Sequence, residues 1–191
     1  MIGVLLILVL GGVMLWMRLT KNISPTWVVY KIKKNKHNPP FTIKTYAPIK
    51  NSLMFSIIFA EGCDYDTSSL KSDALDINKA YGISYGFDPH WNSIRVGWRW
   101  NRTKKMIEVF WYVYSTGKRT YKHITDVALF EQVDFSITRQ GNIVHLRGNV
   151  EDKAFHYIFR ISDSWIRFKM FPYFGGNKKA PCDMKIVISD R

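Results

Sequence analysis

Aromatic and charged residues that could contact a ligand are concentrated between residues 93 and 125, where they alternate along predicted strands. In a strand, side chains two residues apart point to the same face. Closing a hairpin over Asn101 to Met106 pairs Trp100 with Ile107, so apolar residues meet on one face. The opposite face then carries charged and aromatic pairs: Arg99 across from Glu108, and Arg95 across from Tyr112.

The next hairpin closes through Thr116 and Gly117, because glycine supplies the positive φ that a two-residue turn needs. Pairing Ser115 with Lys118 adds further pairs to the same polar face: Tyr112 with Tyr121, Tyr114 with Arg119, and Phe110 with His123. From this face we predict a ligand-binding site formed by Arg95, Arg99, Glu108, Tyr112, Tyr114, Arg119, Tyr121 and His123.

Rings and charges of this kind suit several ligands. Exposed rings stack on sugars and on the bases of single-stranded nucleic acid, and arginine pairs with anions. Hydrolysis of a glycosidic bond needs two carboxylates across that bond, whereas this face has only Glu108, which Arg99 would hold ionised as an ordinary cross-strand pair. The pattern therefore favours binding over catalysis, and rings that merely fill the space between two sheets are the structural alternative.

The sequence predicts no metal and no cofactor. The five histidines show no spacing of zinc ligands, and no P-loop is present. Gly82 to Gly86 has the Gly-x-Ser-x-Gly pattern without the strand–turn–helix context of a hydrolase. The only cysteines, Cys63 and Cys182, are too few for a disulfide framework, so we expect two separate buried thiols, with a pairing left open.

The elements that must position these side chains are short strands. From residue 41 onward the apolar pattern has period two and is interrupted by Gly, Asn, Asp and Pro. The predicted strands are Ser52–Ala60, Ala80–Gly86, Ser93–Trp100, Met106–Tyr114, Arg119–Thr125, Val133–Thr138, Ile143–Val150, Ala154–Ile161, Trp165–Phe171 and Met184–Ser189. One apolar and one polar face per strand is typical of two packed sheets, so the sequence predicts an all-β, jelly-roll-like antiparallel β-sandwich.

The strand number, the Trp- and Tyr-rich strands from Ser93 to Tyr114 and the segment from Phe171 to Gly176 resemble the concanavalin-like jelly rolls of lectins and glucanases. This resemblance covers residues 41–191 at the level of the fold, and it implies a ligand on the concave sheet face. The paired acidic motif of the glucanases, Glu-x-Asp-x-x-Glu, is absent. The Arg, Gln-x-His and Tyr motifs of jelly-roll polysaccharide lyases are also absent, so no catalytic residue is carried over.

The chain begins with an uncharged apolar segment from Ile2 to Met17. As a helix it would span about 24 Å, which approaches the bilayer core of about 30 Å when Arg18 snorkels to the interface. Neither a basic region before it nor a small-residue cleavage site after it is present, so an uncleaved transmembrane helix is favoured over a secretory signal. We predict a transmembrane anchor over 1–19, a basic juxtamembrane linker over 20–40 and a sandwich domain over 41–191.

The linker is rich in proline and lysine, although Thr26 to Lys33 could also form a short strand. The excess of Lys and Arg after the anchor favours a cytoplasmic domain, with an extracytoplasmic domain as the alternative. The formal net charge of +13, from 28 Lys and Arg against 15 Asp and Glu, suits anionic partners such as membrane lipid, nucleic acid or acidic polysaccharide.

Three functions follow from these patterns, in order of preference. The first is a membrane-anchored, non-catalytic module whose concave face binds a glycan or a protein segment. The second is a polysaccharide-cleaving enzyme that uses the same groove. The third is a structural component of a membrane or virion assembly. The lipid bilayer is a partner in all three, and nucleic acid remains an alternative ligand.

Overall fold

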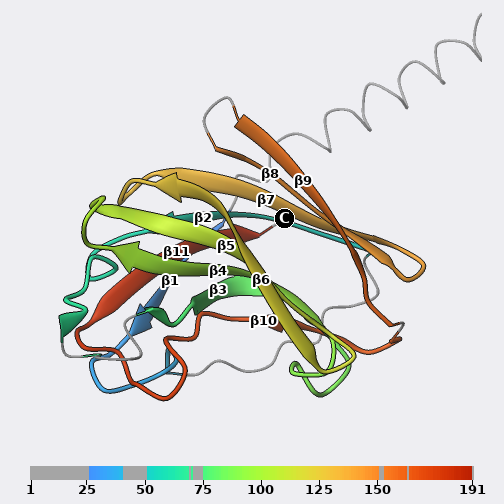
Figure 1. Cartoon of the computed structure of the whole chain (residues 1–191), viewed down its shortest axis with the longest axis horizontal. Coiled ribbons are helices and arrows are strands. Elements are labelled where there is room, and N and C mark those ends of the chain that lie inside the picture. Colours follow the sequence, from blue (N-terminus) through green and yellow to red (C-terminus); the bar gives the residue numbers. More distant parts are fainter. Residues whose placement is uncertain are drawn as a thin grey trace, which may run out of the picture.

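The computed structural model describes residues 26–40, 51–68, 70, 75–150, 153–162 and 164–190, and eleven strands in these ranges form two antiparallel sheets (Figure 1). No α-helix occurs within the described ranges. Because apolar and polar residues alternate along most strands, each sheet buries one face against the other. The described part of the chain is therefore an all-β two-sheet sandwich, as the sequence predicts.

One sheet has six strands in the order β1-β11-β2-β7-β8-β9. Its strands are β1 (Trp27–Ile32), β2 (Ser52–Phe59), β7 (Gln132–Gln140), β8 (Ile143–Val150), β9 (Lys153–Arg160) and β11 (Met184–Asp190). The other sheet has five strands in the order β10-β3-β4-β5-β6. Its strands are β3 (Asn78–Tyr85), β4 (Ser93–Asn101), β5 (Met106–Ser115), β6 (Lys118–Val127) and β10 (Arg167–Met170).

The core between the sheets is rich in aromatic rings. Trp98 of β4 is fully buried, and its ring centroid lies 5.2 Å from that of Phe59 of β2. Phe55 of β2 lies at the same centroid distance, 5.2 Å, from Tyr81 of β3. Burying a large apolar side chain contributes about 1.5 to 3 kcal/mol. These contacts hold the five-stranded sheet by its inner face and leave its outer face for a site.

The two hairpins of the five-stranded sheet have the register predicted from the sequence. Thr116 and Gly117 in the second turn have φ values of 50° and 78°, as a tight hairpin turn requires. The observed pairs are Trp100–Ile107, Arg99–Glu108, Arg95–Tyr112, Tyr112–Tyr121, Tyr114–Arg119 and Phe110–His123. The polar face inferred from the alternation is therefore a real sheet face.

The linker prediction is wrong for residues 27–32, which form strand β1 and pair with β11 from Trp27–Ser189 to Ile32–Met184. β1 is an edge strand with one neighbour, and of its six residues only Ile32 is fully buried. An edge strand needs little apolar surface to stay in place. The short strand that the sequence offered as the alternative over Thr26 to Lys33 is therefore present, and it is held largely by backbone pairing.

The predicted anchor over 1–19 and the predicted domain start at residue 41 lie outside the described residues. Within the ranges that are described, no helix has the length and apolar character needed to cross a bilayer. The anchor therefore stays a prediction from the sequence.

Candidate functional site

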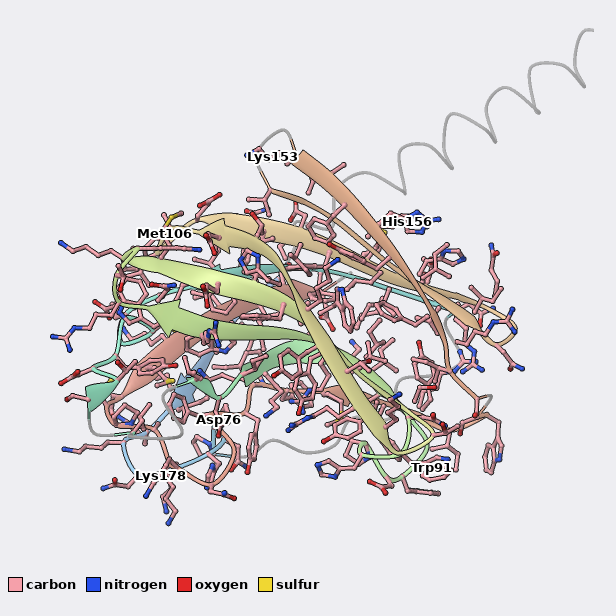
Figure 2. The ribbon with its side chains drawn as sticks, viewed as in Figure 1. Asp76, Trp91, Met106, Lys153, His156 and Lys178 are labelled. Carbon is pink, nitrogen blue, oxygen red and sulfur yellow. The ribbon has the colours of Figure 1, made fainter. Side chains whose placement is uncertain are left out.

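A groove crosses the outer face of the five-stranded sheet and is bordered by the chain that follows β10. Its main part has a volume of about 390 Å³ and an adjoining part about 250 Å³, and the two parts share Lys79, Tyr112 and Arg119. Asp76, in the adjoining part, lies on the same side of the molecule as Lys178 (Figure 2). We call the two parts together the sheet groove.

Arg95 lines the main part of the groove from a buried position on β4. Its Nη2 donates a hydrogen bond to the carbonyl oxygen of Phe171 (3.0 Å), while Nε has no hydrogen-bond partner among the described residues. Burial lowers the pKa of Arg95 to about 10, so the side chain stays charged at neutral pH. Among the described lining residues Asp76 is the only carboxylate, so the groove attracts anions.

Lys79 is aimed into the groove by a β-bulge near the start of β3. The pairing with β4 shifts between Lys79 and Tyr81, which leaves Ala80 as the inserted residue. The Lys79 backbone also exchanges two hydrogen bonds with Tyr173, of 2.9 and 2.8 Å. These bonds fix the loop after β10 as a wall of the groove.

The Lys79 ammonium group is held among rings and other cations. Its Nζ lies 4.9 Å from the Tyr112 ring centroid and donates to the carbonyl oxygen of Gly175 (3.1 Å). Burial, together with repulsion from Arg95 and Arg119 and against the opposing effect of Asp76, lowers the pKa of Lys79 to about 8. The mutual repulsion of these cations is unfavourable, and an anionic ligand would relieve it.

Tyr112 is the centre of the aromatic floor. Burial and the neighbouring Tyr114 raise the pKa of Tyr112 to about 12, and the Arg119 guanidinium opposes the shift. Its ring is stacked with that of Tyr121, with centroids 6.3 Å apart and planes inclined by 12°. Tyr121 is 51% exposed. Tyr112 itself is buried, so of these two rings the floor presents that of Tyr121 to solvent, beside the cationic groups.

Five of the eight predicted site residues lie on the groove: Arg95, Tyr112, Tyr114, Arg119 and Tyr121. Arg99, Glu108 and His123 are on the same strands but do not line it. The prediction missed Lys79 and Tyr173. Lys79 could not be assigned because the bulge changes the alternation. Tyr173 belongs to the segment that carries the jelly-roll resemblance, which was the one available signal.

Arg99 and Glu108 instead form an ion pair at the end of the sheet, and His123 lies beside Asp126 there. Arg99 donates to Glu108, and Asn101 Nδ2 donates to the other carboxylate oxygen of Glu108 (2.8 Å). His123 Nε2 lies 2.7 Å from Asp126 Oδ1. Burial raises the pKa of Glu108, but the hydrogen bonds from Asn101 and Arg99 outweigh it and hold the pKa below its usual value. Glu108 is therefore a satisfied structural carboxylate.

We expect Glu108→Gln to destabilise the fold by about 2 kcal/mol, because it leaves the half-buried Arg99 without its counter-charge. The lowered pKa means that Glu108 stabilises the fold above its unfolded-state pKa, and that this contribution is lost as the pH falls through the lower folded-state pKa. Urea unfolding should show the difference in free energy of unfolding between the parent and Glu108→Gln at pH 7. The difference should be much smaller at about pH 3. A difference of equal size at both pH values would contradict this assignment.

Within the described ranges, no group of three or more His, Cys, Asp or Glu side chains could hold a metal ion. Cys63 and Cys182 are free thiols, and their sulfur atoms donate to the carbonyl oxygens of Lys185 (3.3 Å) and Gly62 (3.5 Å). Burial raises the pKa of both thiols. Both are therefore protonated at neutral pH, and neither is an activated nucleophile.

No protein-family model matches the sequence, and comparison with curated proteins finds no match. Solved structures do match. An exolytic alginate lyase from Zobellia galactanivorans has a TM-score of 0.59 at 11% identity, over 89% of this chain and 85% of that one. A functionally unknown protein from Saccharomyces cerevisiae gives 0.57 at 8% identity, over 88% and 90%. The alginate lyase from Klebsiella pneumoniae gives 0.54 at 13% identity, over 72% and 56%.

The fold is a concanavalin-like jelly roll. The resemblance that the sequence suggested is thereby confirmed at the level of the fold. The chain spans only 56% of the length of the Klebsiella lyase. At these identities the likeness carries no ligand and no reaction to this chain, so the function must be argued from the groove itself.

Proposed function

We propose that the sheet groove binds a segment of an acidic polysaccharide. The observation that carries the proposal is the grouping of Lys79, Arg95 and Arg119 around a floor of tyrosine rings. Hydrogen bonds between cations and carboxylates or sulfates are about twice as strong as neutral ones. Tyrosine rings pack against the apolar faces of sugars. An acidic glycan uses both features of the groove, whereas a neutral glycan uses only one.

The fold is compatible with this proposal. Two of the solved structures that share it are named as alginate lyases, so jelly rolls of this kind accommodate a polysaccharide in those proteins. An acidic protein segment would meet the same cations. The exposed Tyr121 ring that lines the groove favours a sugar, because an aromatic face can pack on the C–H face of a pyranose.

The full-length protein is expected to bind oligomers of uronic acid more tightly than neutral oligomers of the same length, as measured by calorimetry in detergent. Tyr121→Ala should weaken this binding about tenfold, because one exposed ring contributes about 1 to 3 kcal/mol. Phe130→Ala, at another exposed ring in the loop before β7, is the matched control. Equal affinity for acidic and neutral oligomers would refute the proposal.

A second candidate is cleavage of the bound polyuronate by β-elimination. The Lys79 amine, whose pKa burial lowers to about 8, could remove the proton beside the uronate carboxyl group while Arg119 neutralises that carboxyl. The electron pair forms a carbon–carbon double bond, the glycosidic C–O bond breaks, and the leaving oxygen takes a proton from Tyr112. A rise in ultraviolet absorbance that Lys79→Met abolishes supports cleavage. Binding without new absorbance assigns the chain as a binding module.

The membrane tether is the remaining part of the proposal. Residues 1–19 have the apolar character of an anchor, and the basic residues that follow favour a cytoplasmic domain. Protease accessibility of the domain in sealed membrane vesicles distinguishes this side from the extracytoplasmic one.

A further inference from the structure

Three aromatic side chains protrude from one end of the sandwich. Phe87 and Trp91 belong to the loop between β3 and β4, and Trp165 to the loop between β9 and β10. Their exposed fractions are 71%, 54% and 77%. Trp91 lies at the opposite end of the view from Met106, which begins β5 (Figure 2). We call Phe87, Trp91 and Trp165 the aromatic tip.

The backbone beneath the aromatic tip is tied together. Gly86 N donates to Ile166 O (2.9 Å), which joins the two loops, and Gly117 N donates to Trp91 O (3.0 Å), which joins the β5–β6 turn to them. Asn92 Oδ1 accepts from Thr116 N (3.0 Å). The rings are therefore held out by bonded loops, and the apolar surface that they expose contributes nothing to the fold. This exposed apolar surface remains available to an external apolar partner.

The charges around the aromatic tip suit an anionic surface. Lys118 follows the β5–β6 turn and is exposed, and so is Arg160 at the end of β9, whose carbonyl oxygen accepts from Ser115 Oγ (2.7 Å). The β3–β4 loop also carries Asp88, which remains exposed and charged while its Oδ1 accepts from the backbone N–H of His90 (2.8 Å), so this carboxylate partly offsets the two cations. Aromatic rings flanked by Lys and Arg are the composition that settles at the headgroup level of a membrane.

The strand pairings place the chain entry at the same end. β1 begins at Trp27 beside Ser189, near the end of β11, and β2 begins at Ser52 beside Thr138, near the end of β7. The β7–β8 turn at this end leads to Ile143, which pairs with Arg160 just before the tip loop. The apolar segment from Ile2 to Met17 precedes β1 in the sequence. A membrane held by that segment would face this end of the sandwich.

We propose that the aromatic tip inserts into the interfacial layer of a phospholipid bilayer, with Lys118 and Arg160 meeting anionic headgroups. This docking is independent of what the sheet groove binds. It fixes the orientation of the domain on the membrane, since a single tether alone would leave the sandwich free to rotate. A glycan or a protein on the tip would be a different partner, and the experiment separates these cases.

The test uses the full-length chain in vesicles of phosphatidylcholine and phosphatidylglycerol, with a nitrobenzoxadiazole fluorophore on an introduced cysteine. Ser162→Cys places the fluorophore beside the tip without removing a ring, and Thr103→Cys places it in the exposed β4–β5 turn at the other end. Nitroxide-labelled lipid should quench most of the emission at residue 162 and little at residue 103. Iodide in the water should do the reverse. The chain without an introduced cysteine serves as the control for background labelling of the native thiol Cys182.

Replacing Phe87 and Trp165 with Ser in the Ser162→Cys chain should remove most of the quenching by lipid, while the anchor keeps the protein in the vesicles. Equal quenching at residues 162 and 103 would overturn the proposal. It would also be overturned if the fluorophore at residue 162 stayed accessible to iodide in vesicles and became shielded only when an acidic oligosaccharide was added, which would assign the tip to the glycan.

Discussion

A chain that carries both Lys79→Met and Arg119→Met is expected to bind a uronic acid oligomer at least about 100-fold more weakly than the parent chain. Each hydrogen bond to a charged group contributes about 1.5 to 3 kcal/mol, and about 1.4 kcal/mol is a tenfold change in affinity. Both side chains line the two parts of the sheet groove, so both would contact the same ligand. Methionine keeps most of the unbranched apolar stem of each side chain while removing its charge. Isothermal titration calorimetry measures the effect.

The matched control removes the same charge elsewhere. Lys122 on β6 and Lys153 on β9 are exposed and do not line the groove, and Lys153 lies at the margin of the molecule in Figure 2. Lys122→Met with Lys153→Met should change affinity only slightly, because exposed charges are screened by salt. A comparable loss in the two double variants would show that net charge, and not the groove, attracts the ligand.

The pH dependence gives a second reading of the same site. Burial lowers the pKa of Lys79 to about 8, so its positive charge is lost as the pH rises through that value in the unliganded protein. Arg95 and Tyr112, with pKa values of about 10 and about 12, keep their charge states there. Affinity for the acidic oligomer should therefore fall between pH 7 and about pH 9. Lys79→Arg should abolish that fall, since arginine stays charged.

The sequence predicts the pairing of β4 with β5, and that of β5 with β6 from the turn as far as Phe110–His123, where an unpredicted bulge shifts the register. β4 and β5 each have one apolar face, and a shift of register by one residue would expose it. Gly117 adds a turn of defined length, so the pairing of Arg95 with Tyr112 and of Tyr114 with Arg119 follows from local pattern alone. Most of the groove floor is predictable from the sequence for this reason.

The rest of the groove depends on contacts between distant segments. Tyr173 reaches the groove because its backbone pairs with that of Lys79. Neither local sequence has a pattern that predicts this pairing. The bulge at Ala80 reverses the alternation on which a prediction of Lys79 would depend. For a related reason the edge strand β1 was only the alternative to a linker over Thr26 to Lys33, since its main support is the backbone of β11. The local periodicity of apolar residues predicts where strands lie. It does not predict which segments distant in the sequence pair with them.

Trp98→Ala is expected to lower the free energy of unfolding by about 4 kcal/mol, the largest effect on stability that we predict. Trp98 has no exposed surface, and its ring lies 5.2 Å from Phe59 and 5.9 Å from Tyr65 between centroids. Removing it opens a cavity where the two sheets meet, and the surrounding strands cannot close it. Urea unfolding followed by circular dichroism measures the loss.

Trp98 also supports the groove through a chain of contacts. Tyr65, against which it packs, accepts a hydrogen bond from Asn78 Nδ2 (3.0 Å). Asn78 Oδ1 accepts from Gly175 N (2.6 Å), and the carbonyl oxygen of Gly175 in turn accepts from Lys79 Nζ. A displacement of Tyr65 would therefore change the position of the Lys79 ammonium group, which we propose contacts the ligand. Trp98→Ala should weaken oligosaccharide binding even at a temperature where the variant is fully folded.

Trp111→Ala separates this coupling from general loss of stability. Trp111 also belongs to the five-stranded sheet, but its ring packs on Phe159 of β9, with centroids 5.0 Å apart, and has no contact in the chain that leads to Gly175. It is partly exposed, so the loss of stability should be about 2 to 3 kcal/mol. Binding by folded Trp111→Ala should match the parent. If both variants lost affinity equally, the groove would be sensitive to the sandwich as a whole, and not to the path through Tyr65 and Asn78.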